Sequence, residues 1–232
     1  MRLTEYQAKN AAARRNSMAS MIICESRCRR VLPPINSEIM QAVETSERAT
    51  GIRRKLWTRN EAAKLADMFP GERYELIEGE LINKMGQKPP HAYVIAVLTK
   101  ILGAAFSGRI RIQSSITLPD PDGQYSEPEP DIVLLYSADP QFFTRHPGPD
   151  DIALLIEVAD ATFAFDRSTK YRLYARARIQ EYWIIDIPNR RAVMCRSPQG
   201  DDYRSVTIFS DQDTIAPTSE PEFSLRVSEL FS

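Results

Sequence analysis

Two short, strongly apolar segments constrain the fold of this chain more than any other feature of its sequence. Residues 131–136 read DIVLLY and residues 152–158 read IALLIEV, and proline or polar residues bound each segment. Apolar runs of this length are typical of strands that are buried inside a sheet rather than of helices. Since buried strands need other elements to cover them, the two segments favour a sheet with packed layers.

The segments around these two strands predict a mixture of helices and strands. A capping-box pattern from Thr58 to Glu61 predicts a helix that continues through Met68. The next patterns along the chain predict a β-hairpin over 73–85, a long apolar helix over 91–106, a strand over 110–118 and a tight turn over 119–123. After the two apolar strands, the patterns predict an amphipathic helix over 166–178, a strand over 181–186 and two or three further strands. This order predicts an α/β domain of the mixed α+β kind, with a mixed sheet flanked by helices, over residues 56–232.

The first 55 residues differ from the rest of the chain in pattern and charge. They contain the turn-like VLPPIN and the basic RCRR, without a sustained amphipathic repeat, and we expect a weakly ordered basic extension. A helix that docks on a partner and a start codon placed too early are the alternatives. Residues 1–55 hold 11 Lys and Arg against 5 Asp and Glu, a net +6, whereas the remainder holds 19 against 26, a net −7.

This asymmetry limits how the domain could contact nucleic acid. A domain with a net charge of −7 does not bind nucleic acid through bulk charge alone. It would need a local basic face, a metal that neutralises clustered carboxylates, or the basic extension as an arm. The charge therefore argues against a tight, non-catalytic DNA binder more than against an enzyme that contacts phosphates transiently.

Other classes of protein receive little support from the sequence. No run approaches the roughly 18 apolar residues that cross a bilayer, and the N-terminus lacks the order of a secretory signal. Cys24, Cys28 and Cys195 cannot all pair within one chain, and no further ligands complete a zinc set. A reducing cytoplasm is therefore expected. Neither a glycine-rich phosphate loop nor a G-x-S-x-G elbow is present.

Two carboxylates stand where the apolar strands would present them. Asp131 opens the first segment after Pro130, and Glu157 lies near the end of the second. A carboxylate in such a run is costly to bury unless it is paired or bound to a metal. Mg²⁺ prefers one or two carboxylates together with water and substrate phosphate, which Asp131 and Glu157 could supply. The alternative is that Asp131 caps a strand end and that Glu157 makes an ordinary salt bridge.

Three further polar residues are candidates for the same site. Lys170 would place a cation near an attacking water, where negative charge develops. Alternatively, Asp166 could be the N-cap of the helix, and Lys170, one turn later, could form an ion pair with it. Glu75 lies in YELIEGEL between apolar neighbours, and His91 follows two prolines at a helix start. A histidine in that position is more often a capping or packing residue than a ligand.

Taken together, the segments of this chain resemble the Uma-type restriction endonuclease family, a branch of the PD-(D/E)XK nuclease superfamily. The matching stretches cover most of residues 55–232 in order, and each is weak alone whereas six in sequence are specific. They are YELIEGEL at 74–81, KPPHAYV around His91, EPEPD at 127–131, LIEVAD at 155–160, DRSTK at 166–170 followed by LYARA, and EYWIID at 181–186.

The resemblance implies a mixed sheet flanked by helices and a divalent metal, Mg²⁺ or Mn²⁺. By position, Asp131 and Glu157 match the metal-binding carboxylates, and Glu157 also counts among the catalytic residues. Lys170 matches the catalytic lysine, while Glu75 and His91 align with accessory polar positions.

Two departures from the family pattern bear on the site. The chain reads Val158-Ala159 after Glu157, so the lysine expected two residues on is absent, and Lys170 would have to supply the amine. Arg178 stands where the family usually has a glycine. If the backbone there has a positive φ, a non-glycine residue costs on the order of 1 kcal/mol.

The sequence therefore predicts a metal-dependent endonuclease that hydrolyses DNA phosphodiester bonds. The first alternative is a nuclease fold that serves as an interaction module with little or no cleavage, and the second is a metal-dependent hydrolase of a smaller phosphate ester. A homodimer is expected, since cleavage of both strands is simplest with two active sites related by two-fold symmetry.

Overall fold

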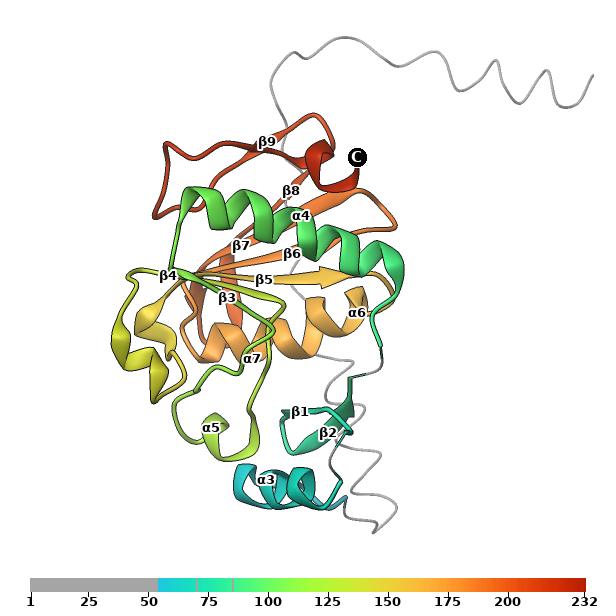
Figure 1. The fold of residues 1–232 in the computed structure, drawn as a ribbon, viewed down its shortest axis with the longest axis vertical. Helices are drawn as coiled ribbons and strands as arrows, with labels where there is room; N and C mark the ends of the chain where they lie inside the picture. Colours follow the sequence, from blue (N-terminus) through green and yellow to red (C-terminus); the bar gives the residue numbers. More distant parts are fainter. Residues whose placement is uncertain (1–53, 70, 85) are drawn as a thin grey trace, which may run out of the picture.

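The computed structural model describes residues 54–69, 71–84 and 86–232, coloured by sequence in Figure 1. The expected weakly ordered extension lies outside these residues except for its last two positions, and Cys24 and Cys28 lie outside them too. Cys195 is a buried free thiol.

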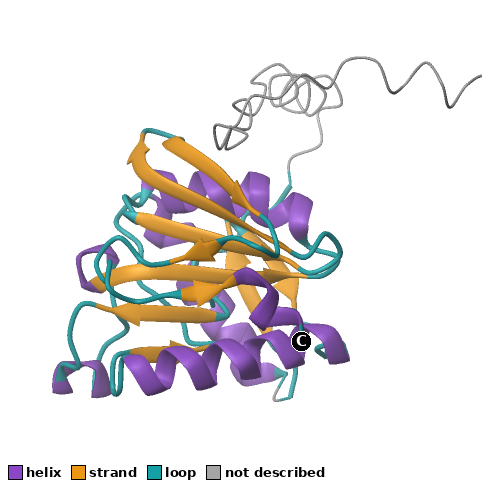
Figure 2. Cartoon of the chain, turned by 90° about the horizontal axis from the view of Figure 1, so that it is seen from above, coloured by secondary structure: helices purple, strands orange, loops and turns teal. Residues whose placement is uncertain are grey.

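A six-stranded mixed sheet forms the centre of the fold. Its strand order is β3-β4-β5-β6-β7-β8, with β5 and β6 parallel and the other neighbours antiparallel. The strands are β3 (Ile110–Ile112), β4 (Ile132–Leu135), β5 (Ile152–Ala159), β6 (Glu181–Asp186), β7 (Arg191–Gln199) and β8 (Asp202–Phe209). Figure 2 shows how these strands fan out as the sheet twists. The predicted mixed sheet is confirmed.

Helices cover both faces of this sheet (Figure 1). Helix α4 (Pro89–Ala105) packs on one face, and the helical segment of α6 (Phe163–Phe165), η3 (Asp166–Lys170) and α7 (Tyr171–Arg176) packs on the other. Because successive residues of a strand point to opposite faces, β4 and β5 contribute to both cores. Tyr182 packs in the core under α7 and Trp183 in the core under α4, and both are fully buried.

A smaller unit, formed by a helix and a hairpin, precedes the sheet in sequence. It lies beside the sheet at the lower end of Figure 1, where α3 is labelled. Helix α3 (Arg59–Met68) begins at Thr58, whose side chain and that of Glu61 make the predicted reciprocal capping bonds. Strands β1 (Tyr74–Ile77) and β2 (Glu80–Asn83) form the predicted hairpin. Glu78 and Gly79 have φ of 50° and 81°, which suits the tight turn of a twisted hairpin.

Two predicted boundaries differ from the structure. The strand predicted over residues 110–118 is only β3, because Gln113 adopts φ 46° and breaks the ladder. The long apolar helix begins at Pro89, two residues earlier than predicted, since proline is well suited to the first helical position, where its missing N–H is not needed. The predicted turn after residue 118 leads into the short α5 (Asp122–Tyr125).

The helix predicted over residues 166–178 begins at Phe163 instead, so Asp166 lies inside it and the N-cap interpretation is wrong. The Tyr171 N–H bonds to the Asp166 carbonyl five residues back, which makes one wide π-helical turn. Such turns occur frequently at functional sites. Arg178 ends the helix with φ 62°, so the expected local strain is present.

The chain after β8 closes the core under α4. It comprises β9 (Thr214–Ile215), β10 (Leu225–Arg226) and the 3₁₀ turn η4 (Val227–Phe231), while η1 (Pro140–Phe143) and η2 (Pro149–Asp151) lie between β4 and β5. Four strands thus follow β6, two of them only two residues long. Within the described ranges, no helix is long and apolar enough to cross a membrane.

Candidate active site

The pairing of β4 with β5 brings the two predicted metal-binding carboxylates together. Ile132 pairs with Ile156 in an antiparallel register, so Asp131, directly before β4, lies opposite Glu157. Directly opposed residues of antiparallel strands point to the same face. The Val158 N–H donates to Asp131 Oδ2 at 2.9 Å, which holds the aspartate against β5. Asp131 and Glu157 are 6% and 4% exposed.

Both carboxylates line a cavity of about 720 Å³ that opens beside the end of β5. Every residue predicted for the site contributes to its wall. These residues are Glu75, His91, Asp131, Glu157 and Lys170. Residues that lie up to 95 positions apart in the chain thus meet in one place, and their chemical roles stay predictions.

Lys170 reaches Glu157 from the helix that covers the sheet. Its Nζ lies 2.9 Å from Glu157 Oε1 and 2.9 Å from Glu75 Oε1, and the residue is 5% exposed. Burial lowers the pKa of this ammonium, but Glu157 and Glu75 more than offset that effect and keep the pKa above its usual range. An amine therefore stands beside Glu157 although residue 159 is alanine.

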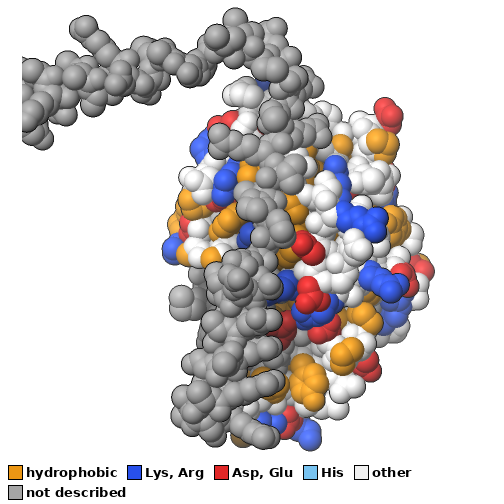
Figure 3. Space-filling model, turned by 180° about the vertical axis from the view of Figure 1, so that it is seen from behind, with side chains coloured by type: hydrophobic (Ala, Val, Ile, Leu, Met, Phe, Trp, Pro, Cys, Tyr) orange, Lys and Arg blue, Asp and Glu red, His pale blue; other side chains and the backbone are white. Residues whose placement is uncertain are grey.

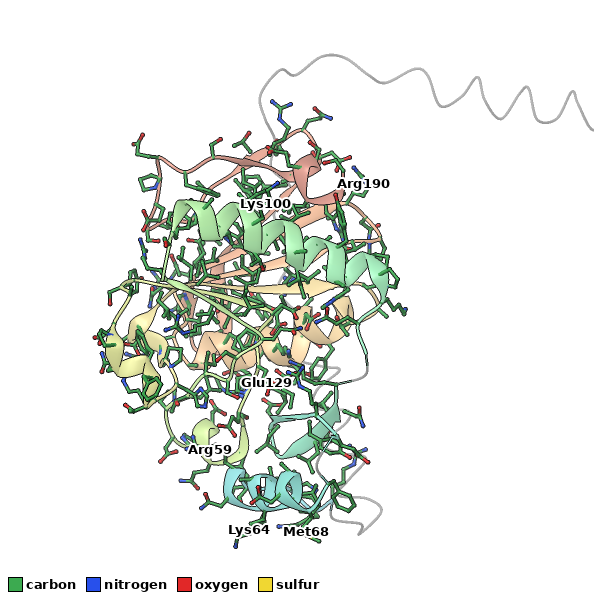
Figure 4. All side chains as sticks on the ribbon, viewed as in Figure 1. Arg59, Lys64, Met68, Lys100, Glu129 and Arg190 are labelled. Atoms are coloured by element: carbon green, nitrogen blue, oxygen red, sulfur yellow. The ribbon has the colours of Figure 1, made fainter. Side chains whose placement is uncertain are left out.

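Glu75 connects the hairpin to the site. Its Oε1 accepts a hydrogen bond from the backbone N–H of Glu129 at 2.8 Å, in addition to the bond with Lys170. Figure 4 labels Glu129 in the space between the hairpin and the main sheet. The Glu129 carboxylate pairs with Arg73 at 2.9 Å and Lys84 at 3.2 Å. These contacts fasten the hairpin so that Glu75 holds Lys170 in place.

His91 faces Asp131 from the first turn of α4. Its Nε2 lies 3.3 Å from Asp131 Oδ2, whereas the N-cap of the helix is Lys88, so His91 is not the capping residue. The hydrogen bond with Asp131 raises the pKa of His91. Burial would raise the pKa of Asp131, but its contacts with His91 outweigh this and lower it.

Asp166 adds a further carboxylate that sequence interpretation treated as a cap. It is 3% exposed, lines the cavity and accepts a hydrogen bond from Thr162 Oγ1 at 2.6 Å. Lys170 makes its two close ion pairs with Glu75 and Glu157 rather than with Asp166. Burial raises the pKa of Asp166 to about 6, and Lys170 and Thr162 oppose that rise.

Negative charge exceeds positive charge around Glu157. Four buried carboxylates, including Asp131 and Asp166, surround the single ammonium of Lys170. Burial raises the pKa of Glu157 to about 8; Lys170 lowers it, and the neighbouring carboxylates add to the rise. An additional cation in the cavity would favour the ionised form of Glu157.

The donor set fits a hard divalent cation. Among the described residues, no three His, Cys, Asp or Glu side chains converge as a ready-made metal cage. Mg²⁺ does not require one, because it commonly keeps several waters and takes only one or two carboxylates plus substrate phosphate. Asp131 and Glu157 face one cavity that is short of positive charge, so they have the chemistry and placement for such an ion.

Sequence interpretation missed Tyr174. Its hydroxyl donates to Glu157 Oε1 at 2.8 Å, and the residue is completely buried. Asp166, Lys170 and Tyr174 are spaced four residues apart, and residues at this spacing lie on one side of a helix. This spacing is the sequence signal that could have placed Tyr174 beside Lys170, but only the packing of α7 shows that this side of the helix faces Glu157.

The cavity rim is more basic than the acidic domain as a whole. Arg73, Lys84 and Lys88 line the cavity, and Lys88 Nζ lies 3.3 Å from Asp160 Oδ2. On the face seen in Figure 3, basic and acidic described side chains are interspersed. The rim is thus a candidate for the local basic face that the charge of the domain requires.

Comparison with known proteins finds a family model and a solved structure that are similar to this chain. A family model described as "Uma2: Putative restriction endonuclease" matches residues 60–228. A crystal structure of a putative nuclease belonging to DUF820 from Anabaena variabilis is similar with a TM-score of 0.55 and 20% identity, over 75% of this chain and 97% of that one. At this identity the likeness shows the fold alone. No curated protein matches the chain.

Proposed function

Since the chain belongs to the Uma2 family of putative restriction endonucleases, we propose that it is a divalent-metal-dependent endonuclease that hydrolyses phosphodiester bonds in DNA. The observation that carries this proposal is the meeting of Asp131 and Glu157 on one face of adjacent strands, beside the buried amine of Lys170. A metal, a cation and room for a phosphate are the requirements of this chemistry.

Asp131 and Glu157 would hold Mg²⁺ or Mn²⁺. When bound, such an ion lowers the pKa of a coordinated water and stabilises negative charge on the phosphate. The N–H of Val158 and the ring of His91 keep Asp131 oriented toward the cavity, so the carboxylate needs little rearrangement before it binds an ion.

Lys170 supplies fixed positive charge beside the metal-binding carboxylates. Two carboxylates hold its ammonium, and a charge that is already in position stabilises the developing negative charge without reorganisation. Glu75 acts through Lys170, because it contacts the amine and the backbone of Glu129. These contacts support Lys170 as the cation of the reaction although it stands on the helix rather than on β5.

The rim residues Arg73, Lys84 and Lys88 would contact the DNA backbone. They line the cavity together with Lys170, and their ion pairs with Glu129 and Asp160 can exchange for pairs with phosphates. Because only a few phosphates would be neutralised, we expect weak binding that decreases with salt concentration.

A cleavage assay tests the proposal. Full-length protein is incubated with supercoiled plasmid and Mg²⁺ or Mn²⁺, and Asp131→Asn and Glu157→Gln are compared with Asp186→Asn. Asp186 is a matched control, because it is 1% exposed on the neighbouring strand but is paired with Arg191 at 2.7 Å. We expect cleavage by the wild type and the control, and a loss of at least about 10³-fold in the other two. Cleavage that survives both substitutions would remove this site.

The alternative is an interaction module that does not cleave. The missing lysine at position 159 favours it, and Mn²⁺ calorimetry separates the two, since a module need not bind metal through Asp131. Turnover of a small phosphate diester without DNA cleavage would indicate the smaller substrate instead. The homodimer stays a prediction, which sedimentation with and without DNA would test.

A further inference from the structure

One oxygen of the Glu157 carboxylate accepts hydrogen bonds from two donors. Lys170 Nζ and the Tyr174 hydroxyl both donate to Oε1, at 2.9 and 2.8 Å. Oε2 takes part in neither bond. The two donors come from successive turns of one helix, whereas Glu157 comes from the sheet below it.

This arrangement determines how the carboxylate is turned. The last torsion of a glutamate side chain is broad, so one hydrogen bond leaves its plane poorly defined. A second donor on the same oxygen, from another direction, restricts rotation and distinguishes Oε1 from Oε2. Lys170 alone could not do this as well, since its ammonium is shared with Glu75.

Tyr174 itself is held rigidly. Its ring is fully buried and packs edge-on against Tyr182, with ring centroids 5.1 Å apart and an interplanar angle of 74°. A tyrosine that is fixed by packing on one side and donates at its tip can set the orientation of a carboxylate. Donors of this kind around metal ligands commonly change metal affinity by about 10- to 100-fold.

The hydroxyl is not needed merely to fill the core. The same core contains Tyr203, whose buried hydroxyl has no hydrogen-bond partner among the residues that the structure describes. Tyr182 donates to the backbone carbonyl of Asp166 instead. This core accommodates tyrosine hydroxyls both with and without a carboxylate partner, since Tyr171 donates to Asp202 whereas Tyr203 has no partner, so packing alone does not require the bond from Tyr174 to Glu157.

We propose that Tyr174 is a positioning residue that fixes Glu157 through Oε1 and leaves Oε2 as the oxygen for the divalent ion. This inference rests on the proposed function, because it concerns the metal ligand of the same site. It predicts a role in metal affinity for a side chain that contacts neither the ion nor the DNA.

The test compares Tyr174→Phe with Tyr203→Phe in the full-length protein. Each substitution removes one buried hydroxyl from the same core. Mn²⁺ binding is measured by calorimetry and by the paramagnetic resonance spectrum of bound Mn²⁺, and DNA cleavage is followed as a function of metal concentration. Thermal unfolding of both variants shows whether the core is intact.

For Tyr174→Phe we expect Mn²⁺ binding that is about 10-fold weaker and an altered spectrum of the bound ion. The metal concentration for half-maximal cleavage should rise by the same factor, with a smaller decrease in kcat at saturating metal. Tyr203→Phe should match the wild type in all of these measurements.

Three results bear on the inference in different ways. Equal Mn²⁺ affinity and spectrum in Tyr174→Phe and wild type would overturn it while leaving the proposed function intact. A loss of affinity that accompanies a loss of cooperative unfolding would also overturn it, because the role would then be structural. A wild type that binds no Mn²⁺ would instead remove the proposed function and the inference with it.

Discussion

Two buried glutamates on neighbouring strands differ in how their charge is satisfied. Glu181 at the start of β6 is 1% exposed, and both of its oxygens have partners. Its Oε1 accepts from Arg196 at 2.9 and 2.7 Å and from the Trp183 indole at 2.7 Å, and its Oε2 accepts from the Thr218 N–H at 2.6 Å. This carboxylate ties β6 to β7 and to the C-terminal segment.

Glu157 near the end of β5 is also buried, but the charge of its carboxylate is balanced differently. Its two bonds end on one oxygen, its neighbours include Asp131 and Asp166, and it lines a cavity. Burial of a carboxylate therefore does not by itself mark a reactive site. What distinguishes Glu157 from Glu181 is the excess of negative charge around it and the space beside it.

The largest expected effect is on metal binding and cleavage. Glu157→Gln removes a proposed ligand, so we expect Mn²⁺ affinity to fall at least about 100-fold and cleavage at least about 10³-fold. Glu181→Gln should retain Mn²⁺ affinity within about twofold but unfold more easily, because it weakens the pairing with Arg196. Calorimetry and chemical denaturation measure both. Equal loss of Mn²⁺ binding in the two variants would break the distinction.

The cation partners of the two glutamates give the next comparison. Lys170→Met leaves Glu75 and Glu157 without their buried ammonium, so we expect a loss of about 3 to 5 kcal/mol of stability near pH 8 without metal. Arg196 has a side chain that is 32% exposed, so Arg196→Met should cost no more than about 2 kcal/mol. Urea denaturation checks both values, with Mn²⁺ added to test for partial rescue of the lysine variant. Similar costs for the two variants would contradict the comparison.

The pH dependence of stability tests the region around Glu157 further. Glu157 and Asp166 have folded pKa values of about 8 and about 6, above their ordinary 4.5 and 3.8. Such carboxyls stabilise the protein below the ordinary pKa, and this contribution is lost as the pH rises through the folded pKa.

The free energy of unfolding of the metal-free protein should therefore fall between about pH 5 and about pH 8, and each titrating carboxyl lowers it by at most about 1.4 kcal/mol per pH unit. His91, whose pKa is also raised, contributes in the same direction. Denaturation in chelator across this range measures the slope, which Glu157→Gln should flatten. A slope that this substitution leaves unaltered would show that Glu157 does not titrate in this range.

The smallest expected effect concerns the helix that carries Lys170 and Tyr174. Arg178 ends it with φ 62°, where glycine is less strained, so Arg178→Gly should raise stability by about 1 kcal/mol or less. Mn²⁺ affinity should not change, because the exposed Arg178 side chain does not line the cavity. Thermal unfolding and calorimetry check this together. A changed affinity would mean that the end of the helix is coupled to the site.

Most of the fold could be predicted because its buried elements are strongly apolar. The runs at β4, β5 and β6 and the pattern of α4 identify elements whose burial dominates their energetics. Two predicted element boundaries were wrong, because the apolar pattern alone does not determine where these elements begin or end. β3 ends at Gln113 through a backbone conformation, and the helix containing Asp166 begins earlier because Phe163 and Phe165 pack on the core.

The site could be predicted only in part. Asp131 and Glu157 stood out because a carboxylate in an apolar strand is costly, and that argument needs no tertiary structure. Asp166 was misinterpreted because a local N-cap and a buried helical residue look alike in one sequence. Tyr174 was missed because a tyrosine among apolar residues is ordinarily assigned to the core, which it also joins.

The sequence by itself determined which strands are buried, that α3 begins at Thr58 and which charged residues have an energetic reason to be paired, since these follow from local pattern and burial cost. Only the tertiary structure decided that Lys170 lies between Glu75 and Glu157, that His91 faces Asp131, and that Tyr174 shares an oxygen with Lys170. These contacts depend on strand register and on how helices pack across the sheet, which no local pattern encodes.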